Sequence, residues 1–373
     1  MVVNLSNPEV KPDEIGMWEK INRSVANLSS VPAAEKLFFV QHLGVMLKAG
    51  VSLATSLRTL AKQTANKRLV GILDEMVTRV EQGSSFADSL RPHEKVFGEL
   101  FINMVEAGEI SGRLETVLGQ LFIQMKKHHK MVSKVKGAMT YPLVILFAMS
   151  GIGVFMMIFV VPKITEMLKS FNTELPLATR VLIGVSSAFV NNGPAVALGL
   201  IVVVTIIVKI LKTYKGKYLF QKFLLGLPVF GEIIKKVNLA SFARTVSSLL
   251  KTDIMIIKTF QITASTLGNL HYREALNDAA ESIRKGVAIN EVLAKYPKLF
   301  SPLVIQMIAI GEQTGEVDEI LGELAEFYEE EVDQIMETLP SIIEPVLILV
   351  MGLGVAGVAL AIITPMYSLT DSV

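Results

Sequence analysis

The sequence predicts an all-α membrane protein: two duplicated cytoplasmic antiparallel helical-bundle domains with three transmembrane helices. Three observations carry this prediction: long uncharged apolar stretches, an internal repeat, and apolar residues at helical spacing with no competing strand-like alternation. The composition agrees, because 51% of the residues are hydrophobic and 19% are charged, with a mean hydropathy of +0.49. A soluble domain of this size is usually less apolar.

Composition and motifs also exclude several classes of function. The formal net charge of +1 argues against binding nucleic acid through bulk charge. The chain has no cysteine, which excludes disulfides, thiolate zinc sites and cysteine nucleophiles. It lacks a phosphate-binding loop, a zinc-protease motif and a nucleophile elbow, and its five histidines do not form a ligand set. We therefore expect no catalytic residue, no cofactor and no metal.

Three apolar segments are expected to cross a membrane. Segments 143–161 and 346–364 each hold 19 residues without a charge. At 1.5 Å per residue, each would span roughly 28 Å as a helix. Segment 195–211 is shorter and contains Lys209, whose long side chain can reach the membrane interface. A buried core helix is the alternative for all three, and it carries most weight for the middle segment.

Basic residues predict the orientation of these spans. Lysines gather before the first span and after the second, whereas the loop between them holds only three basic residues. Both clusters should therefore lie in the cytoplasm, together with the amino terminus. The expected order is a short flexible amino-terminal segment (1–32), a first cytoplasmic domain (33–140), transmembrane helix 1 (141–162), an extracytoplasmic loop (163–194), transmembrane helix 2 (195–211), a second cytoplasmic domain (212–340), transmembrane helix 3 (341–365) and an extracytoplasmic tail (366–373).

An internal repeat organises the chain. A shift of 203 residues aligns 39–162 with 242–365 without a gap. The sequence GEISGRLETVL at 108–118 falls on GEQTGEVDEIL at 311–321. The prolines on either side of the first span also fall on the prolines on either side of the last. Because apolar residues recur at helical spacing in both copies, each copy should form a compact antiparallel bundle followed by a span.

A pair of glycines marks a corner in each copy. The signature residues are Gly108, Glu109 and Gly112 in the first copy and Gly311, Glu312 and Gly315 in the second. Glycine adopts a positive φ where a helix ends and the chain restarts, so we expect a tight helix–helix corner at both places. Direct contact of Glu109 or Glu312 with a partner protein is the alternative.

The two copies differ in charge. Residues 32–140 hold 15 basic and 10 acidic residues, whereas residues 209–340 hold 15 basic and 17 acidic residues. We expect the copies to present different surfaces to their partners. The acidic run 326–337 indicates a solvated helix face, with weak binding of a divalent cation as the alternative.

Taken together, these features resemble the F domain of the type II secretion system, which also occurs in platform proteins of type IV pilus assembly. The matching features are the turn at 47–50, the two corners, Tyr141-Pro142 before the first span, Leu175-Pro176 after it, and Gly226-Leu227-Pro228 before the second copy. The resemblance covers about residues 33–366.

The resemblance implies a non-catalytic platform in the inner (cytoplasmic) membrane, beneath a growing pilus or pseudopilus. It implies that the cytoplasmic domains engage a hexameric ATPase and that the spans, within the lipid bilayer, meet pilin or pseudopilin subunits. Other inner-membrane assembly proteins are expected partners, and relatives suggest a homo-oligomer, with a dimer favoured. The machine could be a pilus, a competence filament or a secretion pseudopilus. A small membrane transporter with duplicated halves is the alternative function, although three spans make a poor pathway.

Residues near the last span are candidate intramembrane or interfacial contacts. Glu344 lies at its cytoplasmic end, where placement among the headgroups is favoured over a buried role that pairs it with a basic residue near Lys136 or with a pilin amine. Small residues recur at one-turn spacing, Gly352 with Ala356 and Gly357 with Ala361, and they permit close helix approach. They could serve packing within the chain, self-association or contact with a pilin helix.

Overall fold

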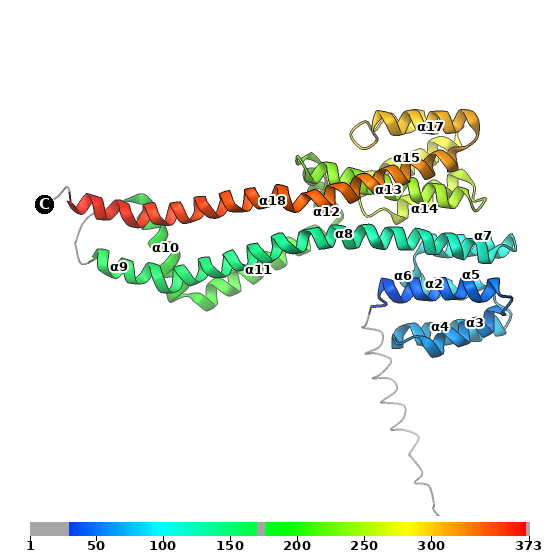
Figure 1. The fold of residues 1–373 in the computed structure, drawn as a ribbon, viewed down its shortest axis with the longest axis horizontal. Helices are drawn as coiled ribbons and strands as arrows, with labels where there is room; N and C mark the ends of the chain where they lie inside the picture. Colours follow the sequence, from blue (N-terminus) through cyan, green and yellow to red (C-terminus); the bar gives the residue numbers. More distant parts are fainter. Residues whose placement is uncertain (1–29, 170–175, 371–373) are drawn as a thin grey trace, which may run out of the picture. The chain divides into compact units, whose positions relative to one another are not determined.

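The computed structural model describes residues 30–169 and 176–370 (Figure 1). Helices make up nearly all of these described residues, and no strand occurs among them. The all-α prediction is therefore confirmed. The expected flexible segment 1–32 lies almost wholly outside the described residues, as do 170–175 and 371–373.

The first repeat is a bundle of short helices that lead into one long helix. Figure 1 shows α2, α3 and α4 lying side by side at the start of the chain. The helices are α2 (Ala33–Lys48), α3 (Leu53–Gln63), α4 (Lys67–Glu81), α5 (Phe86–Leu90), a 3₁₀ turn η1 (Arg91–His93), α6 (Glu94–Phe97), α7 (Glu99–Ile110) and α8 (Leu114–Phe155). Ser52, Asn66 and Ser85 accept backbone N–H bonds at the starts of α3, α4 and α5, which explains where these helices begin.

The second repeat follows the same order. Its helices are α13 (Phe230–Leu250), α14 (Ile256–Thr266), α15 (Leu270–Arg284), α16 (Ile289–Leu293), α17 (Pro302–Thr314) and α18 (Val317–Thr370). Its core holds aromatic rings in edge-to-face contact, with Phe300 packed against both Phe242 and Tyr272. The turn after α2 contains Gly50 at φ +82°, and the same turn after α13 contains Asp253 at φ +60°. Asp tolerates this left-handed backbone better than most residues other than glycine.

The helical bundles of the two repeats form one compact unit, described over residues 30–129 and 238–326. Leu249 and Ile262 of the second repeat are fully buried within the hydrophobic core of the first. Helix α7 of the first repeat also packs against α14 of the second. The two bundles expected from the sequence are therefore present, but they share part of one core.

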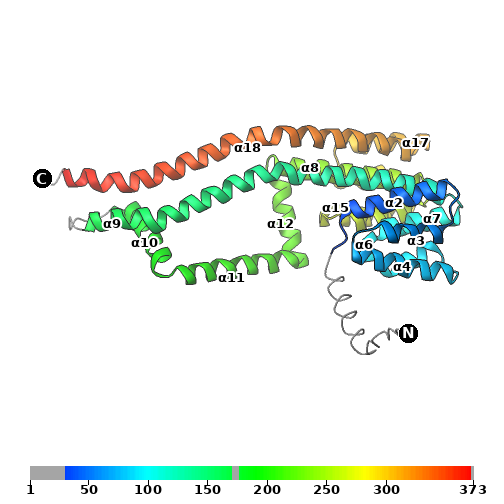
Figure 2. The ribbon, with the colours of Figure 1, turned by 60° about the horizontal axis from the view of Figure 1, so that its bottom comes forward.

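The second unit comprises residues 130–237 and 327–373 and contains the apolar helices. Three helical stretches are long and apolar enough to cross a membrane: Leu114–Met167, Gly193–Lys212 and Val317–Ala361. Side chains in their apolar windows are almost all exposed, as expected for helices that face lipid. The three predicted spans are confirmed, and the alternative of buried core helices is not supported. Figure 2 shows the middle one, α11 (Gly193–Lys212), turning sharply into α12 (Tyr214–Gly226).

The segment 163–194, expected as a loop, is largely helical where it is described. It contains the end of α9 (Val161–Lys169) and α10 (Leu177–Asn191). The Thr179 hydroxyl donates to the Ala361 carbonyl at 2.6 Å, and the Ser186 hydroxyl donates to the Met157 carbonyl at 2.6 Å. Met157 lies in a π-helical turn, η2 (Met156–Val160), where the backbone departs from regular α-helix. Hydroxyls from α10 thus reach one carbonyl of α18 and one carbonyl of the π-helical turn that follows α8.

Candidate functional site

The signature corner of the first repeat is the turn between α7 and α8. Gly112 adopts φ +67°, which a residue with a side chain rarely does. The backbone N–H of Gly112 donates to the Glu109 carbonyl at 3.2 Å, and that of Arg113 donates to the Gly108 carbonyl at 2.8 Å. These two bonds close the end of α7 as a Schellman motif, with glycine in its usual place.

The corner of the second repeat has the same geometry. Gly315 ends α17 at φ +80°, and the backbone N–H of Glu316 donates to the Gly311 carbonyl at 3.0 Å. The first glycine of each motif lies where two helices approach closely. A Cβ at Gly108 would lie 2.8 Å from Val117 Cγ2, and a Cβ at Gly311 would lie 3.0 Å from Val317 Cα. Each motif therefore uses one glycine for backbone conformation and the other for space.

The glutamate of each motif caps a short helix elsewhere in its own repeat. Glu109 accepts the backbone N–H of Phe86 at 2.7 Å on one carboxylate oxygen and that of Ala87 at 3.1 Å on the other. Glu312 accepts the N–H of Ile289 at 2.6 Å and that of Asn290 at 3.0 Å. These amides are the first donors of α5 and α16, which have no partner within the helix itself. A carboxylate suits this position because it also faces the positive end of the helix dipole.

Both oxygens of each signature carboxylate are thus used within the chain. In each repeat the two glycines form the corner, and the glutamate caps the short helix that begins 23 residues upstream. We call this cap the clamp. Sequence reasoning expected the corner but missed the clamp. No side-chain signal marks the clamp, because the donors are backbone N–H groups and Phe86 and Ala87 correspond to Ile289 and Asn290 in the other copy.

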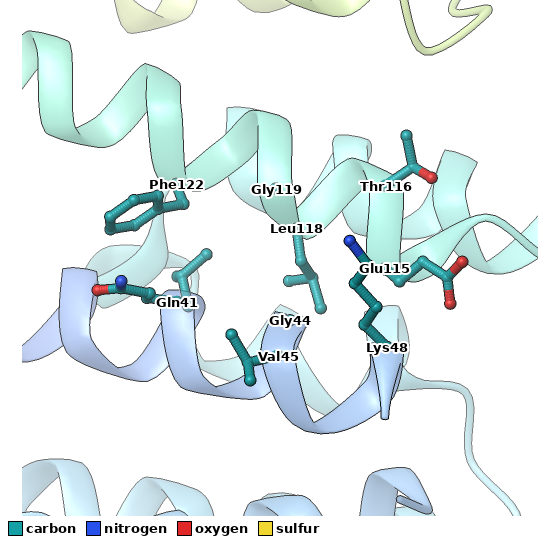
Figure 3. A pocket seen from close by; sticks show the side chains of 10 residues that line it. Gln41, Gly44, Val45, Lys48, Glu115, Thr116, Leu118, Gly119 and Phe122 are labelled. Carbon is teal, nitrogen blue, oxygen red and sulfur yellow. The ribbon is translucent and has the colours of Figure 1, made fainter. Parts of the chain in front are cut away.

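A groove of about 470 Å³ lies between α2 and the start of α8 (Figure 3). Gly44 on α2 and Gly119 on α8 line it; a Cβ at Gly119 would meet no atom within 4 Å, whereas a Cβ at Gly44 would lie 3.4 Å from Leu118 Cβ. Figure 3 shows one end closed by Phe122 and Gln41, and the other end flanked by Lys48 and Glu115. The groove therefore has an apolar floor and a charged rim.

The second repeat differs at the corresponding place. Ser247 stands at the position of Gly44, and its hydroxyl donates to the Asp318 carbonyl at 2.7 Å. A Cβ added at Gly322, the counterpart of Gly119, would lie 3.2 Å from that hydroxyl. The side chain of Ser247 thus bridges the two helices in the second repeat, and the groove is a feature in which the repeats differ.

Ion pairs join α8 to α18 beside the apolar stretches. Lys130 and Lys134 lie 3.2 Å and 2.8 Å from the Asp333 carboxylate, and Lys134 lies 3.5 Å from Glu337. A further pair joins α13 to α18, where Lys236 lies 2.6 Å from Glu331. Lys130 and Asp333 are counterparts in the repeat, so opposite charges at one position of the duplicated helix face each other.

The acidic run 326–337 is therefore partly neutralised by lysines and by Arg244, which approaches Glu326 at 3.8 Å. Among the described residues, no group of three or more His, Asp or Glu is placed to hold a metal ion. The cation-binding alternative for this run gains no support.

The remaining candidates lie on the exposed surface of α18. Glu344 is exposed, and no hydrogen bond or ion pair reaches its carboxylate from the part of the chain that the structure describes. Gly352, Ala356 and Gly357 are also exposed, and a Cβ at either glycine would meet no atom within 4 Å. Only Ala361 of this series is buried, at 4% exposure, beneath α10. The structure thus leaves the three small residues available to a partner outside this chain.

Comparison with known proteins identifies a family with the same duplicated organisation. The family described as type II secretion system (T2SS), protein F, matches the chain twice, over residues 39–162 and 242–365. These segments are the two copies of the repeat.

Individual relatives cover nearly the whole chain. The type IV pilus assembly protein PilC of Thermus thermophilus is 34% identical over 97% of this chain and 88% of its own length. PilC of Myxococcus xanthus is 33% identical over 94% of this chain and 84% of its own length. Type II secretion system protein F of Vibrio cholerae is 30% identical over 97% and 89%. The chain therefore belongs to the protein F family of type II secretion and type IV pilus assembly, whose members are inner-membrane platform proteins and not enzymes.

Proposed function

We propose that this platform protein couples a cytoplasmic hexameric ATPase to the assembly of pilin or pseudopilin subunits in the inner membrane. Its amino terminus and both bundles would lie in the cytoplasm, with α10 on the far side of the membrane. Its partners in this role are the ATPase, the pilin-like subunits and other assembly proteins of the membrane. The relatives are pilus assembly and secretion components, which supports this role over that of a transporter.

The observation that carries the proposal is the continuity of α8 and α18. Helix α8 begins in the core of the first repeat, where Leu118 is fully buried, and continues to Phe155 without a break. Helix α18 does the same for the second repeat, from Val317 to Thr370. A continuous helix transmits a displacement along its axis because its backbone hydrogen bonds resist stretching, and prolines such as Pro142 in α8 and Pro345 in α18 remove only single bonds from this series. A movement imposed on a bundle would therefore reach the membrane.

The exposed residues of α18 are the proposed contacts for the pilin-like subunit. Gly352, Ala356 and Gly357 would let an apolar helix approach closely. Glu344 would accept a basic group of that subunit at the level of the headgroups.

The first test is purification of the tagged protein in detergent from its own cells, with mass spectrometry of the proteins that accompany it. We expect a hexameric secretion ATPase and a pilin-like protein. Recovery of neither, from cells that express both, would contradict the proposed partners.

The second test interrupts the proposed transmission of movement along α8. Insertion of three glycines after Gly137 should abolish pilus or pseudopilus assembly while the ATPase still co-purifies. The same insertion after Thr213, where α11 already ends, is the matched control and should be tolerated better. Equal loss of assembly in both variants would argue against transmission through α8.

The orientation can be tested because the chain has no cysteine. Single cysteines at Glu106 and Ser187 provide one site on a bundle and one on α10. A membrane-impermeant maleimide added to intact cells, with the outer membrane permeabilised where there is one, should label only the cysteine at position 187. Labelling of only the cysteine at position 106 would reverse the proposed topology.

A further inference from the structure

The contact between the two repeats joins different faces of the same domain. On the first repeat it uses α7 and α8, and on the second it uses α13 and α14. The Gln124 amide donates to the Thr245 hydroxyl at 3.0 Å and accepts from the Ser248 hydroxyl at 2.9 Å. Leu249 and Ile262 add apolar burial, since both lie in the core of the first repeat at 0% exposure.

Each repeat therefore has two faces that can take part in such a contact. We call the first two helices of each repeat its head face: α2–α3 in the first repeat and α13–α14 in the second. The tail face of the first repeat is α7 with the start of α8, and that of the second repeat is α17 with the start of α18, residues 302–326. Within the chain, the tail face of the first repeat contacts the head face of the second. The outer head face, on α2–α3, and the outer tail face, on α17–α18, remain at the two ends of this arrangement.

Exposure shows that the outer faces are less covered than their inner counterparts. On the head face, Ser248 is half-buried, but its counterpart Val45 is 60% exposed. The fully buried Leu249 corresponds to Met46, and the fully buried Ile262 corresponds to Thr59. Both counterparts are only half-buried.

The outer tail face differs from the inner one in the same way. Ile102 on α7 is buried at 3% exposure, whereas its counterpart Ile305 on α17 is half-buried. Leu303 is 46% exposed. The outer tail face therefore presents apolar side chains to solvent.

Charge makes the two outer faces complementary. The inner tail segment, 99–123, has four acidic residues and one basic residue, and the inner head segment, 238–266, has three basic residues and one acidic residue. Ion pairs form across this contact: Lys258 lies 3.9 Å from Glu99, and Arg113 lies 3.8 Å from Asp253. The outer tail segment, 302–326, has six acidic residues and no basic one; Glu312 caps α16 and Glu326 lies near Arg244, which leaves four acids for a partner. The outer head segment, 35–63, has four basic residues and one acidic residue; Arg58 pairs with Glu81 and Lys36 with the Val96 carbonyl, which leaves Lys48 and Lys62. The outer faces thus repeat the charge pattern of the inner contact, with more negative charge on the tail side.

We propose that a second copy of this chain places its outer tail face, on α17–α18, against the outer head face, on α2–α3, of the first copy. The contact between chains would repeat the contact that already joins the two repeats within each chain. It goes beyond the platform role and does not depend on which ATPase or pilin the protein serves. Because the two faces differ, copies associate head to tail, and a closed assembly uses both outer faces of every copy.

Cysteine cross-linking tests this contact directly, because the native chain has no cysteine. Thr55 and Pro302 are the counterparts of Lys258 and Glu99, whose side chains lie 3.9 Å apart in the inner contact. Two full-length chains with different tags, one carrying Thr55→Cys and the other Pro302→Cys, are co-expressed and treated in membranes with a bis-maleimide whose spacer replaces the reach of the lysine and glutamate side chains. We expect a cross-linked pair that carries both tags. The positive control is one chain with Glu99→Cys and Lys258→Cys, which the same reagent should bridge internally.

The outcomes separate the possible arrangements. Absence of the mixed pair, under conditions that cross-link the internal control, would overturn the proposal. So would efficient linkage of Thr55→Cys chains to one another without linkage to Pro302→Cys chains, because that result indicates a symmetric contact between head faces.

A charge substitution gives a second, independent measurement. Val45 is the counterpart of Ser248, whose partner Gln124 corresponds to the exposed Phe327. Val45→Glu therefore sets a charge against an apolar ring in the proposed contact, and it leaves the core intact because Val45 is 60% exposed. The matched control is Ile110→Glu, at a residue that is 82% exposed and lies outside both outer faces. Native mass spectrometry in detergent should show at least about tenfold weaker association for Val45→Glu and none of this loss for the control. Higher salt should weaken the wild-type assembly. Unchanged association of Val45→Glu would overturn the proposal.

Discussion

Replacement of Glu109 by alanine removes the acceptor of two backbone hydrogen bonds at the start of α5. The amides that it leaves belong to Phe86 and Ala87, which are 0% and 2% exposed. A buried donor left without a partner costs about 1–3 kcal/mol of stability. Water that enters the space left by the Glu109 carboxylate can accept from these amides and recover part of this cost. We expect Glu109→Ala to lower the free energy of unfolding by about 2–4 kcal/mol. Glu109→Gln, which keeps one acceptor oxygen, should lose roughly half as much.

The assay is thermal unfolding of the full-length protein in detergent, followed by circular dichroism. At about 2–4 °C per kcal/mol for a unit of this size, Glu109→Ala should lower the midpoint by roughly 5–15 °C. Hydrogen exchange adds a local measurement, because the amides of residues 86 and 87 should lose protection before the rest of the bundle does.

Two further variants make the result specific. Glu106→Ala, on the same helix, removes only an exposed ion pair with Arg91 and should cost about 1 kcal/mol or less. Glu312→Ala should reproduce the loss in the second repeat, where the same clamp holds α16. If Glu109→Ala is no less stable than Glu106→Ala but fails to co-purify the ATPase, the glutamate acts on a partner and the clamp is not its main role.

Further substitutions probe the corner, the ion pairs and a half-buried histidine. Gly108→Ala places a methyl group against α8 and should cost about 1–3 kcal/mol in thermal unfolding, whereas Gly119→Ala, with nothing within 4 Å, should be neutral or stabilising. Asp333→Lys should lower stability by about 1 kcal/mol, and Lys134→Glu in the same chain should restore part of it; additive losses would argue against the pair. Burial lowers the pKa of His93 despite the nearby acid, so the folded state binds a proton less readily than the unfolded chain. Stability should therefore be full above the unfolded pKa of about 6.5 and fall as pH drops through it, and His93→Gln should flatten this dependence; an unchanged pH profile would contradict this assignment.

Much of the fold follows from local patterns in the sequence. Uncharged apolar length predicts the spans, and helical spacing of apolar residues predicts the bundles. The positive φ angles at Gly112 and Gly315 follow from the glycines themselves, since few other residues adopt that backbone. The sequence did not predict α10 within 163–194, because charge asymmetry reports the side of the membrane and not the local conformation.

The candidate site was only partly predictable. The sequence placed Glu109 and Glu312 at corners, but it left open whether their carboxylates face a partner protein or the chain itself. That choice depends on where α5 and α16 lie, 23 residues away along the chain. Likewise, the acidic run on α18 was expected to face solvent, and the ion pair between Lys134 and Asp333 depends on how α8 and α18 pack.

The sequence by itself determined the duplication, the three spans and the glycine corners, because each depends on residues close together in the chain or on an exact spacing between copies. Only the tertiary structure decided that Leu249 and Ile262 are buried in the core of the other repeat, and that the two repeats meet through unlike faces. The physical reason is that an apolar pattern defines which face of a helix must be buried, but hydrophobic burial is non-directional and does not choose the surface that covers it.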